Sequence, residues 1–282
     1  VTFEFDLRAA PLAGRWLDGS VRFVRTGGAS AADASLPVML FADPGPLPES
    51  IVLSGSGESG FGEFGLSNLV ALPDAVLEGS TFIEPLRTSS ILAQDPTRDD
   101  VFDGFAVGSF FRLVDVPAAS AGSSRYRLTA LTSSPTSADV DLFVGEDLNG
   151  NGEPDEDEVR CVSGSPTADE RCELDIGAGI SPRSFWVLAQ NWDAGAPGPS
   201  DPAATDEVVM HLALAGDAAD ATSVLTATGP GHVDRLQAFD LRLAWNDPGL
   251  VPGSRRFGFL RIGTQTGSEG QLAQIPVEIV RL

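Results

Sequence analysis

The run Ala138-Asp139-Val140-Asp141-Leu142-Phe143-Val144 alternates apolar residues with acidic or small ones along most of its length. Side chains of a β-strand point alternately to its two faces, so this alternation predicts a strand with one face in a core. Similar short runs, bounded by Gly, Pro, Asp or Ser, recur at 20–25, 36–41, 110–114, 125–131, 185–189 and 208–214. Short strands separated by turns are typical of β-sandwiches, and helix signals are scarce. We therefore expect an all-β protein built from tandem sandwiches.

Residues 147–158, which follow this strand, match the pattern of a calcium-binding loop. Such a loop places oxygen ligands at alternate positions and at its last residue, with a glycine, here Gly152, at the sharp turn. The expected ligands are Asp147, Asn149, Asn151, the carbonyl group of Glu153, Asp155 and Glu158. An acidic, solvated loop is the alternative, but such loops rarely combine Asn, Asn and Gly at these steps. We therefore predict that the chain binds Ca²⁺.

The sequence before the loop is strand-like, so the pattern lacks the helix pair of an EF-hand. This favours a structural calcium ion over a sensor, held with an affinity suited to extracellular concentrations. Asp139 and Asp141, two residues apart, are expected on one face of the preceding strand. Paired acids can act in glycosidases, but acids that alternate along a strand more often bind a cation or meet solvent. A supporting or second cation role for this pair is our hypothesis.

Two cysteines, Cys161 and Cys172, lie in a polar stretch after the loop. Two sulfurs alone make a poor zinc site, and neither histidine is near them in sequence. One short-range disulfide is the natural interpretation, and it implies an oxidising compartment.

The formal net charge of the chain is −22. Such a charge repels nucleic acid and anionic membranes and attracts cations. No run approaches the roughly 18 apolar residues of a membrane-spanning helix, so we expect no membrane insertion. The chain opens with Val1-Thr2-Phe3, in strand-like alternation and without an initiator methionine. We interpret this opening as that of a processed product or an excised fragment.

An internal repeat links the two ends of the chain. Phe5-Asp6-Leu7-Arg8 recurs as Phe239-Asp240-Leu241-Arg242, Trp16-Leu17-Asp18-Gly19 is matched to Trp245 and its neighbours, and Leu36-Pro37-Val38 is matched to Ile275-Pro276-Val277. A period this long indicates domain duplication. We expect a small β-sandwich in 1–50 whose leading strand is missing, a Gly-rich connector in 51–85, a calcium-binding, jelly-roll-like sandwich in 86–217, and a second copy of the first sandwich in 218–282. An unpaired edge in the first copy would need cover from another segment or chain.

No motif indicates catalysis. The Gly-x-Gly-x-x-Gly matches between Gly55 and Gly65 lack the βαβ context of a dinucleotide site, and Glu58 and Glu63 would repel phosphate. The chain has 2 histidines and no Gly-x-Ser-x-Gly nucleophile elbow. We therefore expect no catalytic residues in this chain.

The middle of the chain, roughly 86–217, resembles the pre-peptidase C-terminal domain, a small β-sandwich appended to secreted bacterial proteases. The matching stretches are 125–129, 138–144, 184–192 and 208–214, and Asp-Val-Asp-Leu-Phe at 139–143 is the most telling. The flanking repeats are similar to the fibronectin type III-like domain that follows the catalytic domain of subtilisin-like serine proteases. There a Gly-x-Val strand precedes a Leu/Ile-Pro-Val strand, as in Gly19-Ser20-Val21 and Leu36-Pro37-Val38.

The resemblance implies an ancillary role: stabilising a protease, directing its secretion, or holding a substrate or surface. The leading hypothesis is a non-catalytic, calcium-stabilised C-terminal region of a secreted subtilisin-like serine protease, with the catalytic domain in the same polypeptide. None of the protease's own Asp, His and Ser motifs is present, so no catalytic residue is carried over. The alternative is an extracellular adhesion or self-assembling protein that associates through an edge strand. A second alternative, a carbohydrate-binding module, depends on Trp192 as an exposed aromatic.

Overall fold

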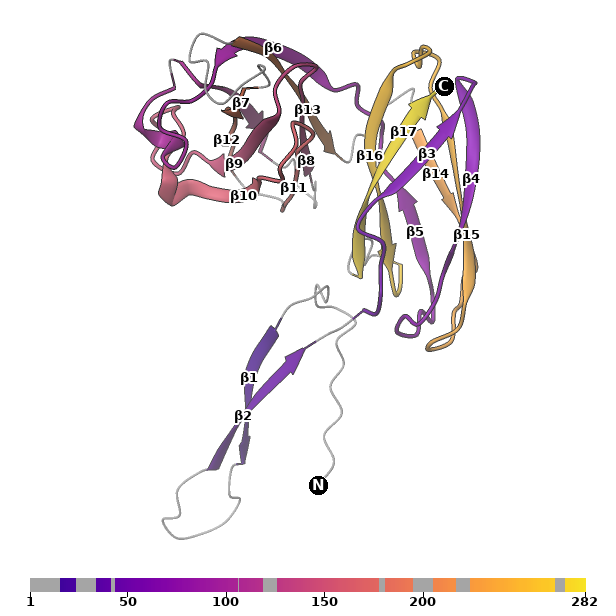
Figure 1. The fold of residues 1–282 in the computed structure, drawn as a ribbon. Coiled ribbons are helices and arrows are strands. Elements are labelled where there is room, and N and C mark those ends of the chain that lie inside the picture. The colour runs from indigo at the N-terminus through magenta and orange to yellow at the C-terminus, as the bar shows by residue number, and fades with distance from the viewer. Residues whose placement is uncertain are drawn as a thin grey trace.

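The computed structural model describes residues 16–23, 34–41, 44–105, 107–118, 126–177, 181–194, 205–216, 224–266 and 272–282. This part of the chain is nearly all β, as the alternating pattern predicts; its helical turns are the short 3-10 helices η1 (Val101–Asp103) and η2 (Glu156–Glu158). Figure 1 shows the strands arranged as a hairpin and two sandwiches. Within the described ranges, no helix has the length and apolar character needed to cross a membrane.

Strands β6 to β13 form one sandwich, here called the inserted sandwich, from sheets of order β10-β9-β12-β7 and β11-β8-β13-β6. The bounds are β6 (Leu86–Ala93), β7 (Ser109–Val116), β8 (Tyr126–Ser133), β9 (Asp139–Glu146), β10 (Val159–Ser163), β11 (Arg171–Ile176), β12 (Arg183–Asp193) and β13 (Thr205–Gly216). Val140, Leu142 and Val144 of β9 are fully buried in the core between the sheets. The period-two run therefore builds the strand that its pattern predicts.

The predicted disulfide is present and joins Cys161 to Cys172. Cys161 lies in β10 and Cys172 in β11, which are edge strands of the two facing sheets. The bond therefore closes one side of the inserted sandwich, directly after the predicted calcium loop.

The other sandwich, here called the terminal sandwich, combines strands from both sides of the insertion. Its sheets have the orders β14-β15-β4 and β3-β17-β16-β5. The bounds are β3 (Ile51–Gly55), β4 (Ser59–Leu66), β5 (Val76–Gly79), β14 (Val224–Thr228), β15 (Phe239–Asn246), β16 (Arg255–Gly263) and β17 (Ala273–Arg281). The expected connector at 51–85 is therefore wrong, because three of its stretches pair with β17, β15 and β16. The range 218–282 is only part of a sandwich by itself.

Close packing explains why β3 and β4 are rich in glycine. A Cβ atom on Gly60 would lie 2.3 Å from Cζ2 of Trp245, and one on Gly55 would lie 2.8 Å from the same atom. A Cβ atom on Gly62 would lie 2.5 Å from Cδ2 of Leu53. The glycines leave room for a buried indole, which is one of the reasons why a strand carries glycine.

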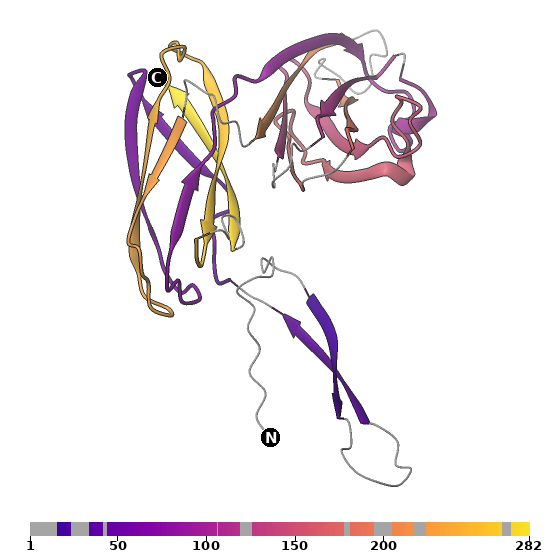
Figure 2. The same ribbon diagram turned by 180° about the vertical axis from the view of Figure 1, so that it is seen from behind.

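Strands β1 (Trp16–Phe23) and β2 (Ala34–Phe41) form an antiparallel hairpin that Figures 1 and 2 show apart from both sandwiches. This hairpin supplies the described strands of the sandwich expected in 1–50; residues 1–15, including Phe5-Asp6-Leu7-Arg8, lie outside the described residues. The strand register shows that the match of Trp16 to Trp245 in the repeat was wrong. β1 corresponds to β16, so Trp16 takes the position of Arg255, whereas Trp245 lies in β15.

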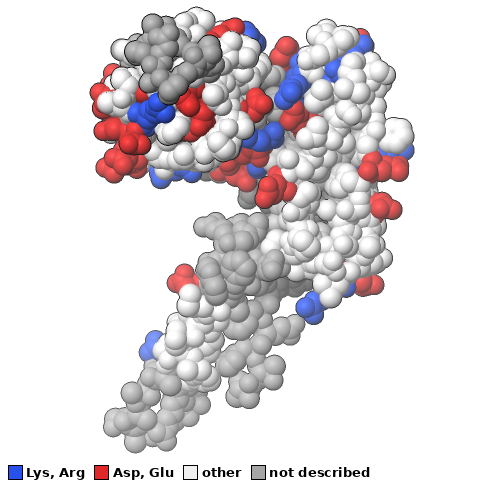
Figure 3. Space-filling view, viewed as in Figure 1, with Lys and Arg blue, Asp and Glu red and all other residues white. Residues whose placement is uncertain are grey.

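An ion-pair network joins the two sandwiches. The buried carboxylate of Glu278, in β17, accepts from Arg171 of β11 at 3.1 Å and from Arg255 of β16 at 3.1 Å. Arg127 of β8 pairs with Glu173 and also donates to the carbonyl oxygen of Gln274 at 3.2 Å. Figure 3 shows charged residues gathered over the inserted sandwich and this junction, whereas the visible face of the terminal sandwich is mostly uncharged.

Candidate calcium loop

The predicted loop leaves the end of β9 and returns to the sheet in β10 through η2. Because β9 lies between β10 and β12, the loop is anchored at an interior position of its sheet. Gly150 and Gly152 have φ angles of +74° and +75°, in the left-handed region that glycine adopts without a steric penalty. Both residues allow the backbone to curl tightly, as the pattern requires at position 6.

Side-chain oxygens of the expected ligands fold the loop back on itself. Asp147 accepts from the backbone N–H of Gly150 at 2.7 Å through Oδ1 and from that of Gly152 at 3.1 Å through Oδ2. Asn149 accepts from the N–H of Asn151 at 2.8 Å, and Asn151 accepts from that of Glu153 at 2.8 Å. These are the local side-chain to backbone turns that Asp and Asn favour.

Three of the expected ligand side chains converge on one point. The amide groups of Asn149 and Asn151 donate to Oδ2 of Asp155 at 2.6 and 3.0 Å. The two amide N–H groups supply the partial positive charge that the carboxylate requires. The side chains at the third, fifth and ninth positions of the loop are thus hydrogen-bonded to one another.

Glu158, the last residue of the loop, is buried and connects its two ends. Its Oε1 accepts from the backbone N–H of Leu148 at 2.7 Å and from that of Asn149 at 3.2 Å. Its Oε2 accepts from the indole N–H of Trp186 at 2.9 Å. A buried carboxylate needs such donors, because an unpaired charge in an apolar environment is costly.

Sequence reasoning missed the apolar support beneath the loop. Trp186 and Leu188 lie on the outer face of β12, where Phe102, Phe143 and Val159 pack against them. The rings of Phe102 and Phe143 have centroids 6.1 Å apart in an edge-to-face arrangement. The signal was present in the sequence: residues 185–189 are apolar at every position, which indicates a strand buried on both faces.

The donor set of the loop fits a hard cation in part. It offers three carboxylates, two amide oxygens and a carbonyl, the oxygen ligands that Ca²⁺ prefers. Asn149 and Asn151, however, point amide nitrogen at Asp155, and both oxygens of Glu158 accept from N–H groups. Among the described residues, no three His, Cys, Asp or Glu side chains are grouped so as to hold a metal. Calcium binding would need the two Asn side chains to turn their oxygens inward.

Asp139 and Asp141 do not support this loop. They lie at the start of β9 and the loop follows its end, which puts Asp139 and the loop about 25 Å apart at the usual rise per strand residue. Burial, followed by the charges of Asp139 and Glu170, raises the pKa of Asp141 to about 6. Burial, followed by Glu170 and Asp193, also raises the pKa of Asp139.

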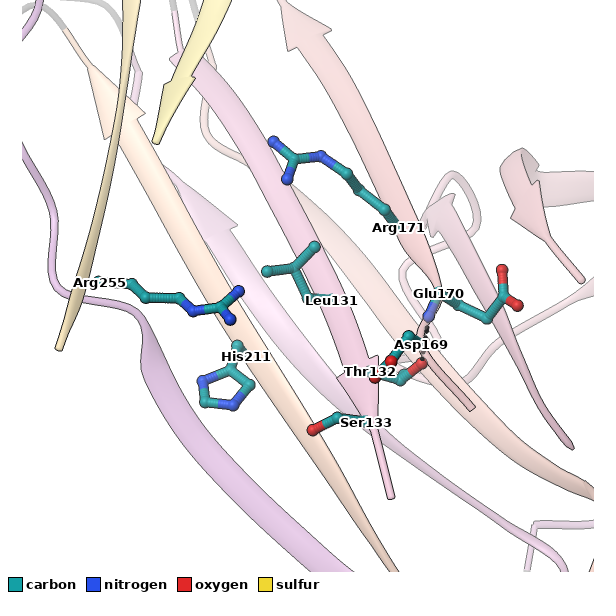
Figure 4. Close-up of a pocket in the computed structure, with 8 residues that line it drawn as sticks. All are labelled: Leu131, Thr132, Ser133, Asp169, Glu170, Arg171, His211 and Arg255. Carbon is teal, nitrogen blue, oxygen red and sulfur yellow. Dashed lines mark hydrogen bonds between the residues drawn. The ribbon is translucent and has the colours of Figure 1, made fainter. Parts of the chain in front are cut away.

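A polar cleft of about 410 Å³ lies at the junction of the two sandwiches. Figure 4 shows Arg255 beside His211, with Arg171 on the far side of Leu131. Burial, followed by the charges of Arg87 and Arg255, lowers the pKa of His211, so this imidazole is neutral at pH 7. Arg171 and Arg255 both pair with Glu278, so the cleft belongs to the junction network.

Trp192 does not present a free ring face on the side where Arg98 lies. The guanidinium carbon of Arg98 is 4.9 Å from the centroid of the indole ring, a cation–π contact. Stacking of a sugar on that face would displace the arginine. Arg98 therefore covers one face of the aromatic ring on which the carbohydrate-binding hypothesis depends.

Comparison with known proteins assigns no family. No protein-family model matches the chain, and no curated protein matches it. Among solved structures, the chain is similar to tripeptidyl peptidase 2, with a TM-score of 0.30 and 9% sequence identity. The match covers 95% of this chain and 25% of that one, so the chain spans about a quarter of that protein's length. A TM-score this low establishes neither a fold family nor a function.

Proposed function

We propose that this chain is a non-catalytic, calcium-stabilised accessory region of a secreted protein, and that the ion binds at residues 147–158. The observation that carries the proposal is the convergence of Asn149, Asn151 and Asp155 within a loop whose ends are joined by Glu158. Asp147, the carbonyl of Glu153 and Glu158 complete the ligand set. The bound ion would supply positive charge that fixes the curl of the loop.

The role is structural because of where the loop lies. It connects adjacent strands β9 and β10, its last residue is hydrogen-bonded to Trp186, and it is followed by the disulfide between Cys161 and Cys172. Disulfides persist in oxidising compartments, which supports secretion. Ordering this loop would therefore stabilise the edge of the inserted sandwich.

Thermal denaturation of the purified chain over a series of CaCl₂ concentrations tests the proposal. A ligand that binds only the folded state at about 100 times its Kd stabilises that state by about 2.7 kcal/mol. We expect Ca²⁺ to raise the melting temperature and a chelator to lower it. Asp147→Ala should remove this response, because it deletes the first ligand.

The matched control is Asp157→Ala, an exposed acid of the same loop outside the ligand positions. It removes the same charge and should leave the response to Ca²⁺ intact. Equal loss of the response in both variants would indicate nonspecific screening of an acidic loop. A melting temperature that does not change with Ca²⁺ or chelator would refute the calcium site.

We further propose that the parent protein is a subtilisin-like serine protease. The support is the sequence resemblance of 139–143 and of the Gly-x-Val and Leu-Pro-Val strands to domains appended to such proteases. The gene sequence upstream of Val1 tests this. An open reading frame that encodes a Ser-His-Asp catalytic domain would support the protease parent, and a different domain there would contradict it.

One observation favours a second candidate, an extracellular adhesion or assembly protein. The hairpin β1–β2 is a two-stranded sheet, and Leu36 and Met39 on it are exposed. Exposed strands with apolar side chains are sites of pairing between chains. Sedimentation analysis over a range of concentrations distinguishes the candidates, because assembly predicts growing oligomers and an accessory region predicts a monomer.

A further inference from the structure

The hairpin β1–β2 has the same strand register as the hairpin β16–β17 of the terminal sandwich. Adding 239 to both residue numbers converts every cross-strand pair of the first hairpin into a pair of the second (16 + 239 = 255 and 41 + 239 = 280; 23 + 239 = 262 and 34 + 239 = 273). The connecting loops therefore also have equal length. Register is set by turn length and by the side-chain pattern, so the agreement marks one structural unit used twice.

Side chains on one face of the two hairpins agree as well. Directly opposed residues share a face, which places Gly19, Val21, Leu36 and Val38 together. Their counterparts are Gly258, Leu260, Ile275 and Val277; the last three are buried in the core of the terminal sandwich. Leu36 is 52% exposed, whereas Ile275 is 2% exposed. The hairpin thus carries the core face of a sandwich without the sheet that would cover it among the described residues.

The opposite faces differ in an informative way. Phe257 and Phe259 of β16 are buried, on a strand that contacts β13 of the inserted sandwich and pairs with the segment leading into it. The corresponding residues of β1 are Asp18 and Ser20. On β1, polar residues here and apolar residues on the other face give the alternation of a sheet with one solvated side, although β2 adds Pro37 and Met39 to this face. The hairpin therefore suits a sandwich with no insertion packed on its outside.

Gly19 indicates that another backbone segment would lie close to β1 in a complete sandwich. A Cβ atom on its counterpart Gly258 would lie 2.7 Å from Oγ of Ser80 and 2.9 Å from the carbonyl oxygen of Thr81, directly after β5. A Cβ atom on Gly19 would meet nothing within 4 Å. Glycine in a strand often marks the close approach of another backbone. Gly19 keeps this feature at a position where the described residues place no such backbone.

We propose that β1–β2 is the closing hairpin of a second sandwich of the terminal type, and that a three-stranded unit with the pattern of β3 to β5 docks on it. In the terminal sandwich, β3 adds to β17 in parallel and β5 adds to β16 in antiparallel orientation. The docking unit would take the same places beside β2 and β1. A two-stranded hairpin is marginally stable in water, so the unit also supplies stability.

Among the described residues, no unpaired unit of this kind remains, so the proposal places the docking unit on a segment other than the described strands. The β3–β5 unit of a second copy is not available, because all three strands are already paired with β17, β15 and β16. Releasing them would dismantle the terminal sandwich, whose core contains Leu53 and Leu66 of this unit. This inference is independent of the proposed calcium site.

The test uses the full chain with an added copy of residues 44–85, joined ahead of Val1 by about 20 Gly and Ser residues, which span about 25 Å as a flexible coil. Hydrogen exchange followed by mass spectrometry reports on the amides of β1 and β2. We expect their exchange to slow at least about tenfold relative to the unmodified chain, because docked strands open less often. Unchanged protection of β14–β17 shows that the terminal sandwich stays intact.

Two variants of the extended chain form a matched pair. Leu36→Asp places a charge on the apolar face and should abolish the slowed exchange, whereas Ser35→Asp places one on the solvated face and should leave it. Hairpin exchange that does not slow in the extended chain overturns the proposal. Hairpin exchange in the unmodified chain that slows as its concentration rises identifies a second copy as the occupant and also overturns it.

Discussion

Trp186 donates its indole N–H to Oε2 of Glu158 at 2.9 Å, and both side chains are buried. Trp186 lies in β12, an interior strand of its sheet, and Glu158 is the last residue of the candidate calcium loop. Because the other carboxylate oxygen holds the backbone of Leu148 and Asn149, this one side chain fixes both ends of the loop to the sheet. The loop is therefore positioned by a buried hydrogen bond between two residues that are 28 positions apart in the sequence.

Replacing Trp186 by Phe tests this anchor. The change keeps an aromatic ring but removes the donor, so a buried carboxylate oxygen loses its partner. We expect the free energy of unfolding to fall by about 1–3 kcal/mol, measured by urea denaturation. Trp192→Phe, on the same strand, is the control and should cost less, since Trp192 is only half-buried. Equal losses in the two variants would mean that ring volume, and not the hydrogen bond, matters.

Removing the disulfide should destabilise the inserted sandwich. The bond closes a short loop, with a sequence separation of 11, between edge strands of facing sheets. Loop-closure entropy predicts a loss of about 3 kcal/mol for the double variant Cys161→Ala, Cys172→Ala, measured by thermal denaturation. Dithiothreitol provides the control, because it should lower the melting temperature of the native chain and leave that of the double variant unchanged. A double variant as stable as the native chain would show that the sheets hold without the bond.

Gly60→Ala should destabilise the terminal sandwich by about 1–3 kcal/mol, the usual cost of overpacking. The new methyl group would lie 2.3 Å from Cζ2 of the buried Trp245, which has little room to move. Gly65→Ala in the same strand is the matched control, because its methyl group would meet only Oδ1 of Asp240 at 3.5 Å, an ordinary contact. Urea denaturation with tryptophan fluorescence measures both. Similar stability of the two variants would contradict the packing role of Gly60.

Features that depend on residues close together in the sequence could be predicted from the sequence. The run at Val140 to Val144 predicts its own strand because burial of one face requires alternation. The curl of the loop follows from Asp147, Asn149 and Gly152, whose partners are a few residues away. The two cysteines and the loop are similarly close in sequence.

Strand pairing between segments far apart in the sequence could not be predicted in this way. Ile51 pairs with Val277, 226 positions away (277 − 51 = 226), and no local pattern encodes that choice. Gly60 weakens the strand pattern of β4, although its lack of a side chain leaves room for Trp245 of β15. A Gly-rich segment is therefore easily taken for a connector when the residue that it packs against is distant in sequence. The insertion of one sandwich into another follows only from these pairings.

The stability of the inserted sandwich should depend on the ionisation of Asp141. Burial, then the charges of Asp139 and Glu170, raises its pKa from 3.8 to about 6. The folded state therefore holds the proton more tightly than the unfolded chain. Between these two pKa values the folded state binds more protons, so the contribution of Asp141 to stability decreases as pH rises through that window. Above it, the ionised carboxylate is a net cost.

Asp141→Asn removes this cost while keeping the size of the side chain. We expect the variant to melt at a higher temperature than the native chain at about pH 7.5, and the difference to shrink at about pH 4, where the native Asp141 is largely protonated when folded. Asp240→Asn, on the exposed side of β15, removes one carboxylate at an exposed position and is the control. Thermal denaturation at the two pH values measures both variants. An Asn variant that melts below the native chain at the higher pH would show that the charge of Asp141 has a favourable partner, such as a bound cation, and would overturn the argument from burial.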